Sequence, residues 1–575
     1  MADDGTGLEQ VIDPWVSSLW AVLPSVVAFD ADKANLFAEN ASSTSPLKKV
    51  KPNTLETTTV IDASSSVVAN GASPMDIVEP AMPDSVNVES TPMDLTPSPH
   101  APSKIPLNLE SVPESSEAVT GVAMLPTNYL LVNETPTSRD PSISKKSLFH
   151  LFDNKVAQDP FEYTANHLFA SHIVAHRYLT GQKALKRVLE ITLDIKAMNW
   201  QVNAGGVVGI LAPNSDEVVL PLLKRLGVDG DKILDVSFVN PASGVGALPF
   251  VTDAPYTAYE AFRYFLDLNP PLRKPLLRVM AEYAMYEKER AALLHLTSPA
   301  GAALFKSLKQ ATPSFADLLA TFPSVTGVPI FRILENLTRL QPRFYSVSKI
   351  DAGAGTISVA FNIVEYTHAV TGRPVIGLCS GYLESLTTSG QSAAQQIALF
   401  PKPNVVFAPP KDAGIPMVLI GAGTGITPFV SFLQSRAEVA KTNGGTQGVL
   451  GEAVLLHGRR FADVRDGDRI YGVELDEFVK DGVLTDFIEI TSRDGDEGIK
   501  YVQHGIVLHG ARIWKTIKDG GQVCVCGGVD MARDVHNALS QVVAEHGGFE
   551  GGDVAVKLFL KTLTSEGRYL KEIWS

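Results

Sequence analysis

The 575-residue sequence has few cysteines, little positive charge and no long apolar run. Cys524 and Cys526 are two positions apart, and the third cysteine is the distant Cys379, so a disulfide framework is not expected. A net charge of -14 argues against a nucleic-acid partner or an anionic membrane surface. No apolar run reaches the ~20 residues of a membrane span, and the start of the chain is acidic. We therefore expect no membrane segment, no nucleic acid and a cytoplasmic location.

The length predicts about three or four domains. Residues from about 36 to 148 are rich in Ser, Thr and Pro and poor in aromatic residues, a composition that predicts a disordered linker. Before this linker, residues 11–23 have the pattern of one amphipathic helix, with Asp13 as its cap and Pro14 in its first turn. A single helix of this length is not a domain, so we expect it to pack on another part of a protein.

From about residue 149 the pattern is that of a globular protein. Within 149–412, strand-like segments are interrupted by helical periodicities over about 225–338. Within 413–575, a strand, a glycine turn and a helix recur in that order. Such alternation predicts a parallel sheet covered by helices.

The most informative stretch is residues 421–429, which follow an apolar run and precede a helical one. Its glycines, Gly421, Gly423 and Gly425, allow close approach of a ligand to the backbone, and Thr424 stands between two of them. The first N–H groups of the following helix point at an anion, and a pyrophosphate fits such a turn. The alternative is a strand-to-helix turn that is rich in glycine but binds no ligand.

Two further segments precede this turn. Arg343, Tyr345 and Ser346 place a cation, an aromatic ring and a hydroxyl together, which could hold a phosphate and a ring, although an ordinary edge strand has the same pattern. Residues 377–383 form a second glycine-bounded turn that enters a helix, again suited to a pyrophosphate but weak evidence when taken alone.

Polar and aromatic groups follow the turn. Residues 492–503 supply a hydroxyl, a guanidinium, an ammonium and a phenol, which fit a phosphomonoester and an adenine ring, although a solvated charged loop is the alternative. Cys526 ends an apolar strand at the sheet edge where ligands bind, or is a plain core cysteine. Trp574 is the penultimate residue, and burial or stacking would explain a tryptophan there.

In this order the segments resemble the diflavin reductases of the ferredoxin–NADP reductase superfamily, over about residues 150–575. The stretches that carry the resemblance are 339–343, 361–366, 500–503, 531–539, 568–570 and 573–575. The resemblance implies an FAD-binding antiparallel β-barrel with a helical insertion, followed by a Rossmann-like NADP-binding domain. It also implies that residues 1–35 are the last helix of a flavodoxin-like domain whose body is missing, through truncation or because it is a separate chain, so that FMN is expected only in a full-length form.

On the FAD side, the resemblance implies that Arg343 binds the pyrophosphate, that Tyr345 lies against the isoalloxazine and that Ser346 lies near its reactive nitrogen. It assigns the FAD phosphates to a set of neighbouring residues, namely Gly377, Leu378, Cys379 and Ser380.

On the NADPH side, the resemblance assigns the pyrophosphate to residues of the glycine turn, namely Gly421, Gly423, Thr424 and Gly425. It assigns the 2′-phosphate end to Ser492, Arg493, Lys500, Tyr501 and Gln503. Cys526 would contact the nicotinamide, and Trp574 would cover the flavin and swing aside. No metal is implied. Glu572 stands where the family usually has Asp, which puts its hydrogen bonds to Ser346 and Cys526 in doubt.

The resemblance implies that NADPH reduces FAD, and that electrons then pass through an FMN domain to a partner protein. Within the family the chain most resembles the branch whose acceptor is methionine synthase. A haemoprotein reductase of the cytochrome P450 type is the nearest alternative, and a flavin-free scaffold is the alternative outside enzymes.

Overall fold

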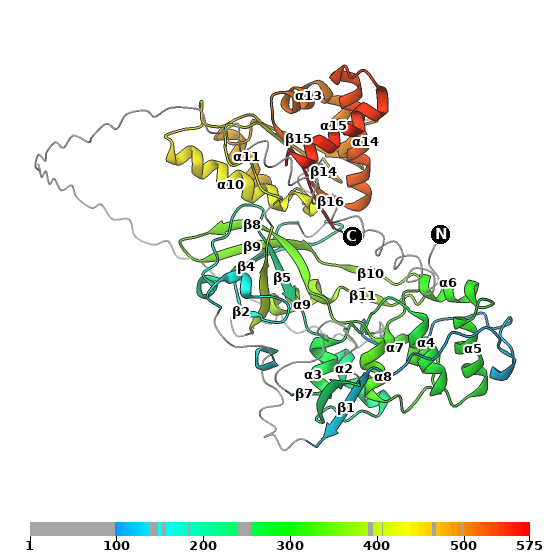
Figure 1. Cartoon of the computed structure of the whole chain (residues 1–575). Helices are drawn as coiled ribbons and strands as arrows, with labels where there is room; N and C mark the ends of the chain where they lie inside the picture. Colours follow the sequence, from blue (N-terminus) through cyan, green and yellow to red (C-terminus); the bar gives the residue numbers. More distant parts are fainter. Residues whose placement is uncertain are drawn as a thin grey trace, which may run out of the picture. The chain divides into compact units, whose positions relative to one another are not determined.

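The computed structural model describes residues 98–136, 148–151, 157–181, 184–239, 255–388, 395–404, 406–462, 467–495 and 498–574. All of these belong to one compact unit, Pro97–Ser575 (Figure 1). The helix expected over 11–23 and the part of the expected linker before residue 98 lie outside the described residues.

The first large element of the fold is an antiparallel sheet that curls around an apolar core (Figure 1). In spatial order its strands are β2 (Phe169–Ser171), β12 (Ile397–Lys402), β5 (Val207–Leu211), β8 (Arg343–Asp351), β9 (Thr356–Asn362), β4 (Val188–Asp194) and β3 (Ile173–Tyr178). Ile191, Ile210 and Val347 are buried in its concave interior. Among the described strands no ladder joins β2 to β3, so the expected barrel takes the form of a half-barrel.

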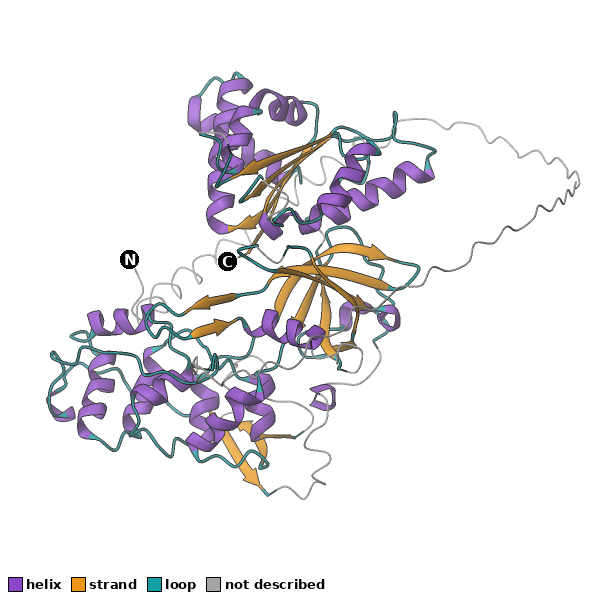
Figure 2. Cartoon of the chain, turned by 180° about the vertical axis from the view of Figure 1, so that it is seen from behind, coloured by secondary structure: helices purple, strands orange, loops and turns teal. Residues whose placement is uncertain are grey.

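A mainly helical insertion lies between β5 and β8, as expected from the periodicities over 225–338, but it starts earlier, with α2. Figure 2 shows its helices gathered at one end of the half-barrel. Its helices are α2 (Asp216–Leu226), α3 (Ala258–Glu260), the π-helical turn η6 (Ala261–Phe265), α4 (Lys274–Glu282), α5 (Glu287–Thr297), α6 (Ala302–Gln310), α7 (Phe315–Thr321) and α8 (Ile330–Asn336). Two strands that the sequence patterns did not predict, β6 (Ile233–Phe238) and β7 (Tyr256–Thr257), are also part of it.

The expectation of a disordered linker over 36–148 is wrong for residues 98–136, which pack along this insertion. Strand β1 (Leu130–Thr135) pairs antiparallel with β6, and Ile105 and Val112 are buried. The backbone N–H of Ser103 donates to Asp317 at 2.7 Å, and the N–H groups of residues 129 and 130 both donate to Glu335. Buried carboxylates on distant helices thus satisfy a backbone that has little secondary structure of its own.

The second large element is a five-stranded parallel sheet. Its order is β15 (Asp486–Thr491), β14 (Ala453–Arg459), β13 (Met417–Ala422), β16 (Gln522–Gly528) and β17 (Tyr569–Trp574). Alternate residues of β13 enter two cores, with Met417 and Leu419 in one and Val418 and Ile420 in the other. A central strand with both faces covered needs such a continuous apolar run. The parallel sheet expected from the sequence is thus confirmed.

Helices cover both faces of this sheet (Figures 1 and 2). On one face lie α10 (Thr427–Thr442) and α11 (Gly472–Lys480), and on the other lie α12 (Val502–Leu508), α13 (Gly510–Lys518), α14 (Val529–Gly547) and α15 (Gly552–Ser565). The core beneath α10 also contains Val188, Ala204 and Ala360 of the half-barrel domain, so the two sheets share a packed boundary.

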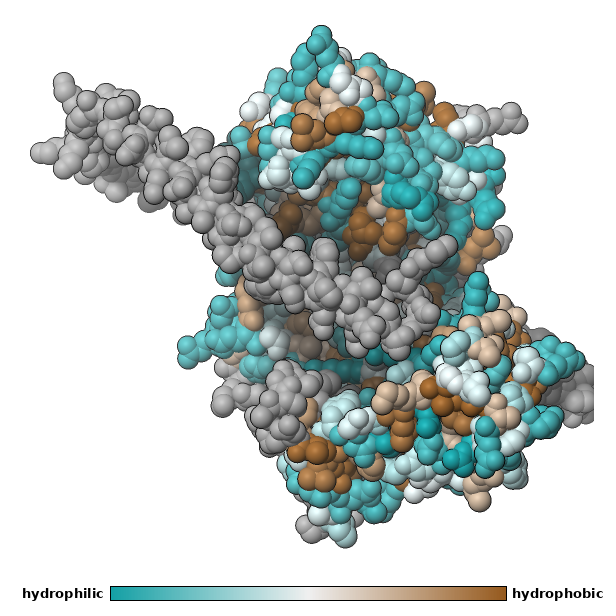
Figure 3. Space-filling view, turned by 45° about the vertical axis from the view of Figure 1, so that its right-hand side comes forward, coloured by the Kyte–Doolittle hydropathy of each residue, from teal (hydrophilic) through white to brown (hydrophobic). Residues whose placement is uncertain are grey.

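The surface of the described residues is mixed in character. Figure 3 shows hydrophobic side chains on one face as small groups among hydrophilic ones. Exposed apolar residues include Met285, Val554 and Leu558. Within the described part of the chain, no helix has both the length and the apolar character that a bilayer crossing requires.

Candidate functional site

A pocket of about 490 Å³ lies at the carboxyl edge of the parallel sheet. Strand order reverses between β13 and β16, and in open α/β sheets ligands bind beside such a reversal. The pocket is lined by residues at or just after the ends of β13, β14, β15 and β16, by the end of β17, and by residues of the half-barrel. Its lining residues include Lys186, Asn362, Gly423, Thr424, Arg459, Arg460, Asp468, Ser492, Lys500, Tyr501, Gln503 and Trp574.

The three glycines of the turn after β13 have different roles. Gly423 lines the pocket, has a φ of +54° and would leave open space around an added Cβ. An added Cβ would instead lie 2.8 Å from the Gly425 carbonyl oxygen at Gly421, and 2.3 Å from the Cys526 carbonyl oxygen at Gly425. Gly421 and Gly425 therefore allow backbones to pack closely, and of these three glycines Gly423 is the one that lines the pocket.

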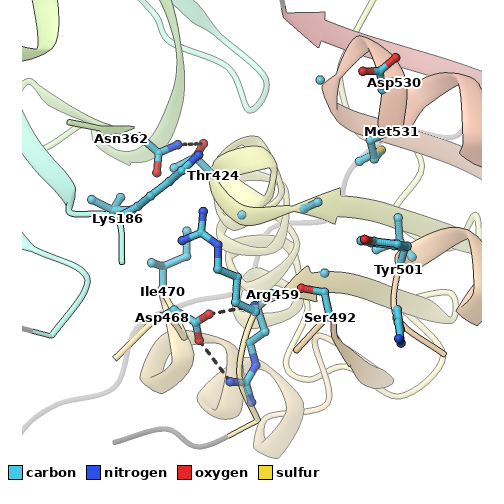
Figure 4. A pocket seen from close by; sticks show the side chains of 18 of the residues that line it. Lys186, Asn362, Thr424, Arg459, Asp468, Ile470, Ser492, Tyr501, Asp530 and Met531 are labelled. Atoms are coloured by element: carbon cyan, nitrogen blue, oxygen red, sulfur yellow. Dashed lines mark hydrogen bonds and ion pairs between the residues drawn. The ribbon is translucent and has the colours of Figure 1, made fainter. Parts of the chain in front are cut away.

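Thr424 joins the glycine turn to the half-barrel. Asn362, at the end of β9, donates from its side-chain nitrogen to the Thr424 hydroxyl oxygen at 3.1 Å. In Figure 4 this pair lies on one side of the pocket, across from Ser492 and Tyr501. The short helix η7 (Gly423–Ile426) and then α10 begin at this point, so their first N–H groups are available to an anion.

Most residues expected at the 2′-phosphate end line the far side of the pocket, namely Ser492, Lys500, Tyr501 and Gln503. The backbone N–H of Lys500 donates to His504 at 3.1 Å, which fixes the start of α12. Arg493 is exposed and does not line the pocket. Its backbone N–H donates to the Arg460 carbonyl, so Arg493 lies next to a pocket residue.

Sequence reasoning missed several charged residues of the pocket, of which Lys186, Arg459, Arg460 and Asp468 are the clearest. Arg459 is paired with Asp468 (Figure 4). It is also paired, at 2.8 Å, with Glu489. Asp468 also accepts from the backbone N–H of Arg460 at 2.8 Å. Arg459 and Arg460 could have been predicted as site residues, because two adjacent arginines stand at the end of an apolar strand. Lys186 has no signal in the sequence, because it enters the pocket only through the fold of the half-barrel.

The residues expected to bind FAD lie on adjacent elements of the half-barrel domain. Arg343 is exposed at the start of β8, where it donates to the Gln341 carbonyl at 2.6 Å. Tyr345 packs against Phe361, with ring centroids 5.2 Å apart, and hydrogen-bonds the Cys379 thiol. Burial raises the pKa of both groups, that of Cys379 to about 11, so both stay protonated.

Residues 377–380 form the turn into helix α9 (Leu378–Thr388). Cys379 and Ser380 are buried, and the Ser380 hydroxyl accepts from the Val364 N–H at 3.1 Å. A Cβ at Gly377 would lie 2.6 Å from the Val364 Cβ. The side chains of Cys379 and Ser380 therefore face inward, and this turn offers a phosphate its backbone N–H groups rather than its side chains. Such a cradle beside an exposed arginine fits a dinucleotide cofactor.

The expected catalytic residues meet where β16 and β17 run side by side. Cys526 pairs in register with Glu572, and Gly528 pairs with Trp574. Burial raises the pKa of Glu572 to about 7, against the smaller opposing effects of a hydrogen bond from Ser346 and the charge of Lys402. Burial and the nearby Glu572 also raise the pKa of Cys526. Ser346, Cys526 and Glu572 are thus brought together. One carboxyl oxygen of Glu572 is buried and has no hydrogen-bond partner in the part of the chain that the structure describes.

Cys526 and Trp574 differ in access to the pocket. Cys526 is fully buried and does not line it, whereas Trp574 lines it and is 39% exposed. A partly exposed tryptophan at the end of an edge strand can move without disturbing a core.

Two family models match the chain. The model for an FAD binding domain matches residues 161–382, and the model for an oxidoreductase NAD-binding domain matches residues 419–537. The first range contains the half-barrel strands apart from β12, and the helical insertion. The second contains β14, β15, β16, all of β13 but its first two residues, and every pocket residue of that domain except Trp574.

The chain is also similar to several named reductases. It is 29% identical over 612 residues to methionine synthase reductase from Homo sapiens, covering 100% of this chain and 82% of that protein. The bovine methionine synthase reductase gives the same identity and coverage. NADPH–cytochrome P450 reductase from Homo sapiens is 29% identical over 420 residues, covering 72% of this chain and 60% of that protein. These matches confirm the resemblance, the fold class and the pair of cofactors, FAD and NADPH, expected from the sequence.

Proposed function

We propose that this chain, an NADPH-dependent FAD oxidoreductase of the diflavin reductase type, delivers its electrons to methionine synthase. The observation that carries the proposal is the pocket at the carboxyl edge of the parallel sheet, to which both domains contribute. Asn362 and Lys186 of the half-barrel domain line it together with Thr424 and Ser492 of the second domain. A coenzyme bound there would touch both domains at once, as transfer between two cofactors requires.

The coenzyme side of the proposal rests on hydrogen-bond donors and positive charge. The N–H groups at the start of η7 and the Thr424 hydroxyl would hold the pyrophosphate. Ser492, Lys500 and Tyr501 would hold the 2′-phosphate, and NADH would leave their polar groups without a partner. We further propose that Arg460 supplies the guanidinium at this end, because it lines the pocket and Arg493 does not.

On the flavin side, Arg343 and the backbone N–H groups at the start of α9 would hold the FAD pyrophosphate, and Tyr345 would lie against the ring. Bound FAD supplies the chemistry, accepting a hydride from NADPH and releasing electrons singly. Trp574 would exclude water from the flavin until it moves aside for the nicotinamide. Ser346, Cys526 and Glu572 would hold a proton beside the reacting position, since the carboxyl of Glu572 titrates near neutral pH.

Methionine synthase is the proposed acceptor because relatives named methionine synthase reductase align with the whole chain, whereas the cytochrome P450 reductases align with 72% of it. The sequence expectation that an FMN-binding flavodoxin domain relays the electrons belongs to the same proposal. The cytoplasmic location expected from the sequence remains a prediction.

The proposal is tested by offering two acceptors to the purified, FAD-loaded chain with NADPH. A separately made FMN-binding flavodoxin domain is added in one series and left out in the other. We expect NADPH-dependent recovery of inactive methionine synthase when the flavodoxin domain is present, and slower reduction of a cytochrome P450 under the same conditions. Faster reduction of the cytochrome P450, with no recovery of methionine synthase, would favour the haemoprotein alternative.

A further inference from the structure

His457 lies beneath the glycine turn and is not among the residues that line the pocket. It is the fifth residue of β14, where it pairs in register with Gly421 of β13 and with Glu489 of β15. Its side chain is fully buried, and its ring stacks on Phe487 at a centroid distance of 6.3 Å and an interplanar angle of 20°. Because Gly421 has no side chain, it leaves room for the imidazole at the neighbouring position on that face of the sheet.

One ring nitrogen of His457 contacts the turn itself. Nε2 lies 3.1 Å from the carbonyl oxygen of Gly423, the one glycine of the turn that faces the pocket. The other nitrogen, Nδ1, is buried and has no hydrogen-bond partner among the described residues. A carbonyl can only accept, so Nε2 carries the proton and donates, and Nδ1 is left as a bare lone pair. Burial lowers the pKa of His457 to about 4, against the smaller opposing effects of the Gly423 hydrogen bond and of Glu489 and Asp468, so the ring stays neutral.

The peptide bond between residues 423 and 424 converts this contact into an effect on the pocket. In a trans peptide the carbonyl oxygen and the following N–H point in opposite directions. Holding the Gly423 oxygen on the buried side therefore turns the Thr424 N–H toward the pocket. Gly423, with a φ of +54° and open space around it, could otherwise rotate and present its oxygen to the ligand.

We infer that His457 is a positioning residue for the coenzyme pyrophosphate. It holds the Gly423–Thr424 peptide in the orientation that offers a donor, rather than an acceptor, to a phosphate. This inference rests on the proposed NADPH site, and it adds a residue that touches neither the coenzyme nor the flavin.

Two substitutions separate the hydrogen bond from the packing of the ring. His457→Phe keeps a stacked ring and removes the donor, whereas His457→Gln can place an amide N–H where Nε2 lies. His546→Phe, at an exposed histidine of α14, is the matched control. Calorimetry on the FAD-loaded proteins measures the binding of NADP⁺, which has the pyrophosphate, and of 2′-AMP, which has only the 2′-phosphate end.

We expect His457→Phe to weaken NADP⁺ binding about three- to tenfold, the range for one lost hydrogen bond, and to leave 2′-AMP binding within about twofold. His457→Gln should restore most of the NADP⁺ affinity. Unchanged NADP⁺ binding in His457→Phe would overturn the inference. Equal weakening of both ligands without rescue by Gln would also overturn it, because it would indicate general damage. Failure of the unaltered chain to bind NADP⁺ would instead reject the proposed function, and this inference with it.

Discussion

Tyr471 donates a 2.7 Å hydrogen bond to Glu190 and thereby joins the NADP-binding domain to the half-barrel. Glu190 is 4% exposed on β4 and also pairs with Arg177 at 2.6 Å. Lys349 of β8 pairs with Glu474 of α11 at 2.8 Å in the same cluster. The carboxylates of Glu190 and Glu474 are thus paired with the cations of Arg177 and Lys349. Charges can be buried at a domain boundary when they are paired in this way.

Tyr471→Phe tests this junction. The substitution keeps the ring but removes one donor from a buried carboxylate, so we expect the free energy of unfolding to fall by about 1–2 kcal/mol. Denaturant unfolding of the FAD-loaded chain measures it. Tyr366→Phe, at an exposed tyrosine of strand β10 (Glu365–Thr367), should change little. If the two variants were equally stable, the hydrogen bond from Tyr471 to Glu190 would not contribute to the free energy of unfolding.

Glu572 predicts a pH dependence of stability with a definite sign. Its folded pKa of about 7 lies above the ordinary value of 4.5, so the folded chain binds the proton more tightly than the unfolded chain. This contribution to stability is complete below about pH 4.5 and is lost as the pH rises to about 7. The difference between the two pKa values corresponds in full to about 3 kcal/mol, of which a part is already lost by pH 5.

We therefore compare the free energy of unfolding of the unaltered chain with that of Glu572→Gln, which cannot titrate at this position. From pH 5 to pH 8 the unaltered chain should lose about 2–3 kcal/mol of stability relative to the variant. Unfolding measured at several pH values gives this difference. Glu550→Gln, at an exposed turn after α14, serves as the control. A difference that does not vary with pH would show that the carboxyl of Glu572 is ionised throughout.

Lys500→Ala tests the 2′-phosphate end of the pocket. Losing one charge-assisted contact costs about 1.5–3 kcal/mol, so the Michaelis constant for NADPH should rise at least about tenfold while that for NADH changes little. Steady-state kinetics with both coenzymes and ferricyanide as acceptor measure the two constants. Lys561→Ala, on the exposed face of α15, controls for the loss of a surface charge. Equal effects on NADPH and NADH would remove Lys500 from the 2′-phosphate end.

Trp574→Ala tests the role of the aromatic ring at the end of β17. If the ring covers the flavin, its removal opens access for the nicotinamide and reduces the discrimination against NADH. The ratio of kcat/KM for NADPH to that for NADH should therefore fall. A variant that retains FAD and keeps the ratio of the unaltered chain would show that Trp574 does not cover the flavin.

The parts of the fold with strong local signals could be predicted from the sequence. The run from Met417 to Ile420 followed by glycines gave β13 and its turn, because a fully buried parallel strand needs continuous apolar residues. Ser492, Lys500 and Tyr501 were expected in the site and line the pocket, since all three follow β15, which ends at that edge of the sheet.

Contacts between distant segments could not be predicted in this way. Lys186 and Asn362 reach the pocket only because the half-barrel packs against α10. The segment 98–136 resembles a linker in composition, yet Asp317 and Glu335, about two hundred residues away, satisfy its backbone. In the sequence, His457 is simply one residue within an apolar strand. Its hydrogen bond to the Gly423 carbonyl depends on how the chain folds into the glycine turn above the strand.

The most direct test of the account is the visible absorbance of the FAD-loaded chain when it is mixed with NADPH in the absence of oxygen. We predict that the flavin absorbance is bleached by NADPH alone, with no FMN and no partner protein present, and much more slowly by NADH. A spectrum that stays unchanged in excess NADPH, while dithionite bleaches it, would contradict the claim that this pocket delivers electrons from NADPH to FAD.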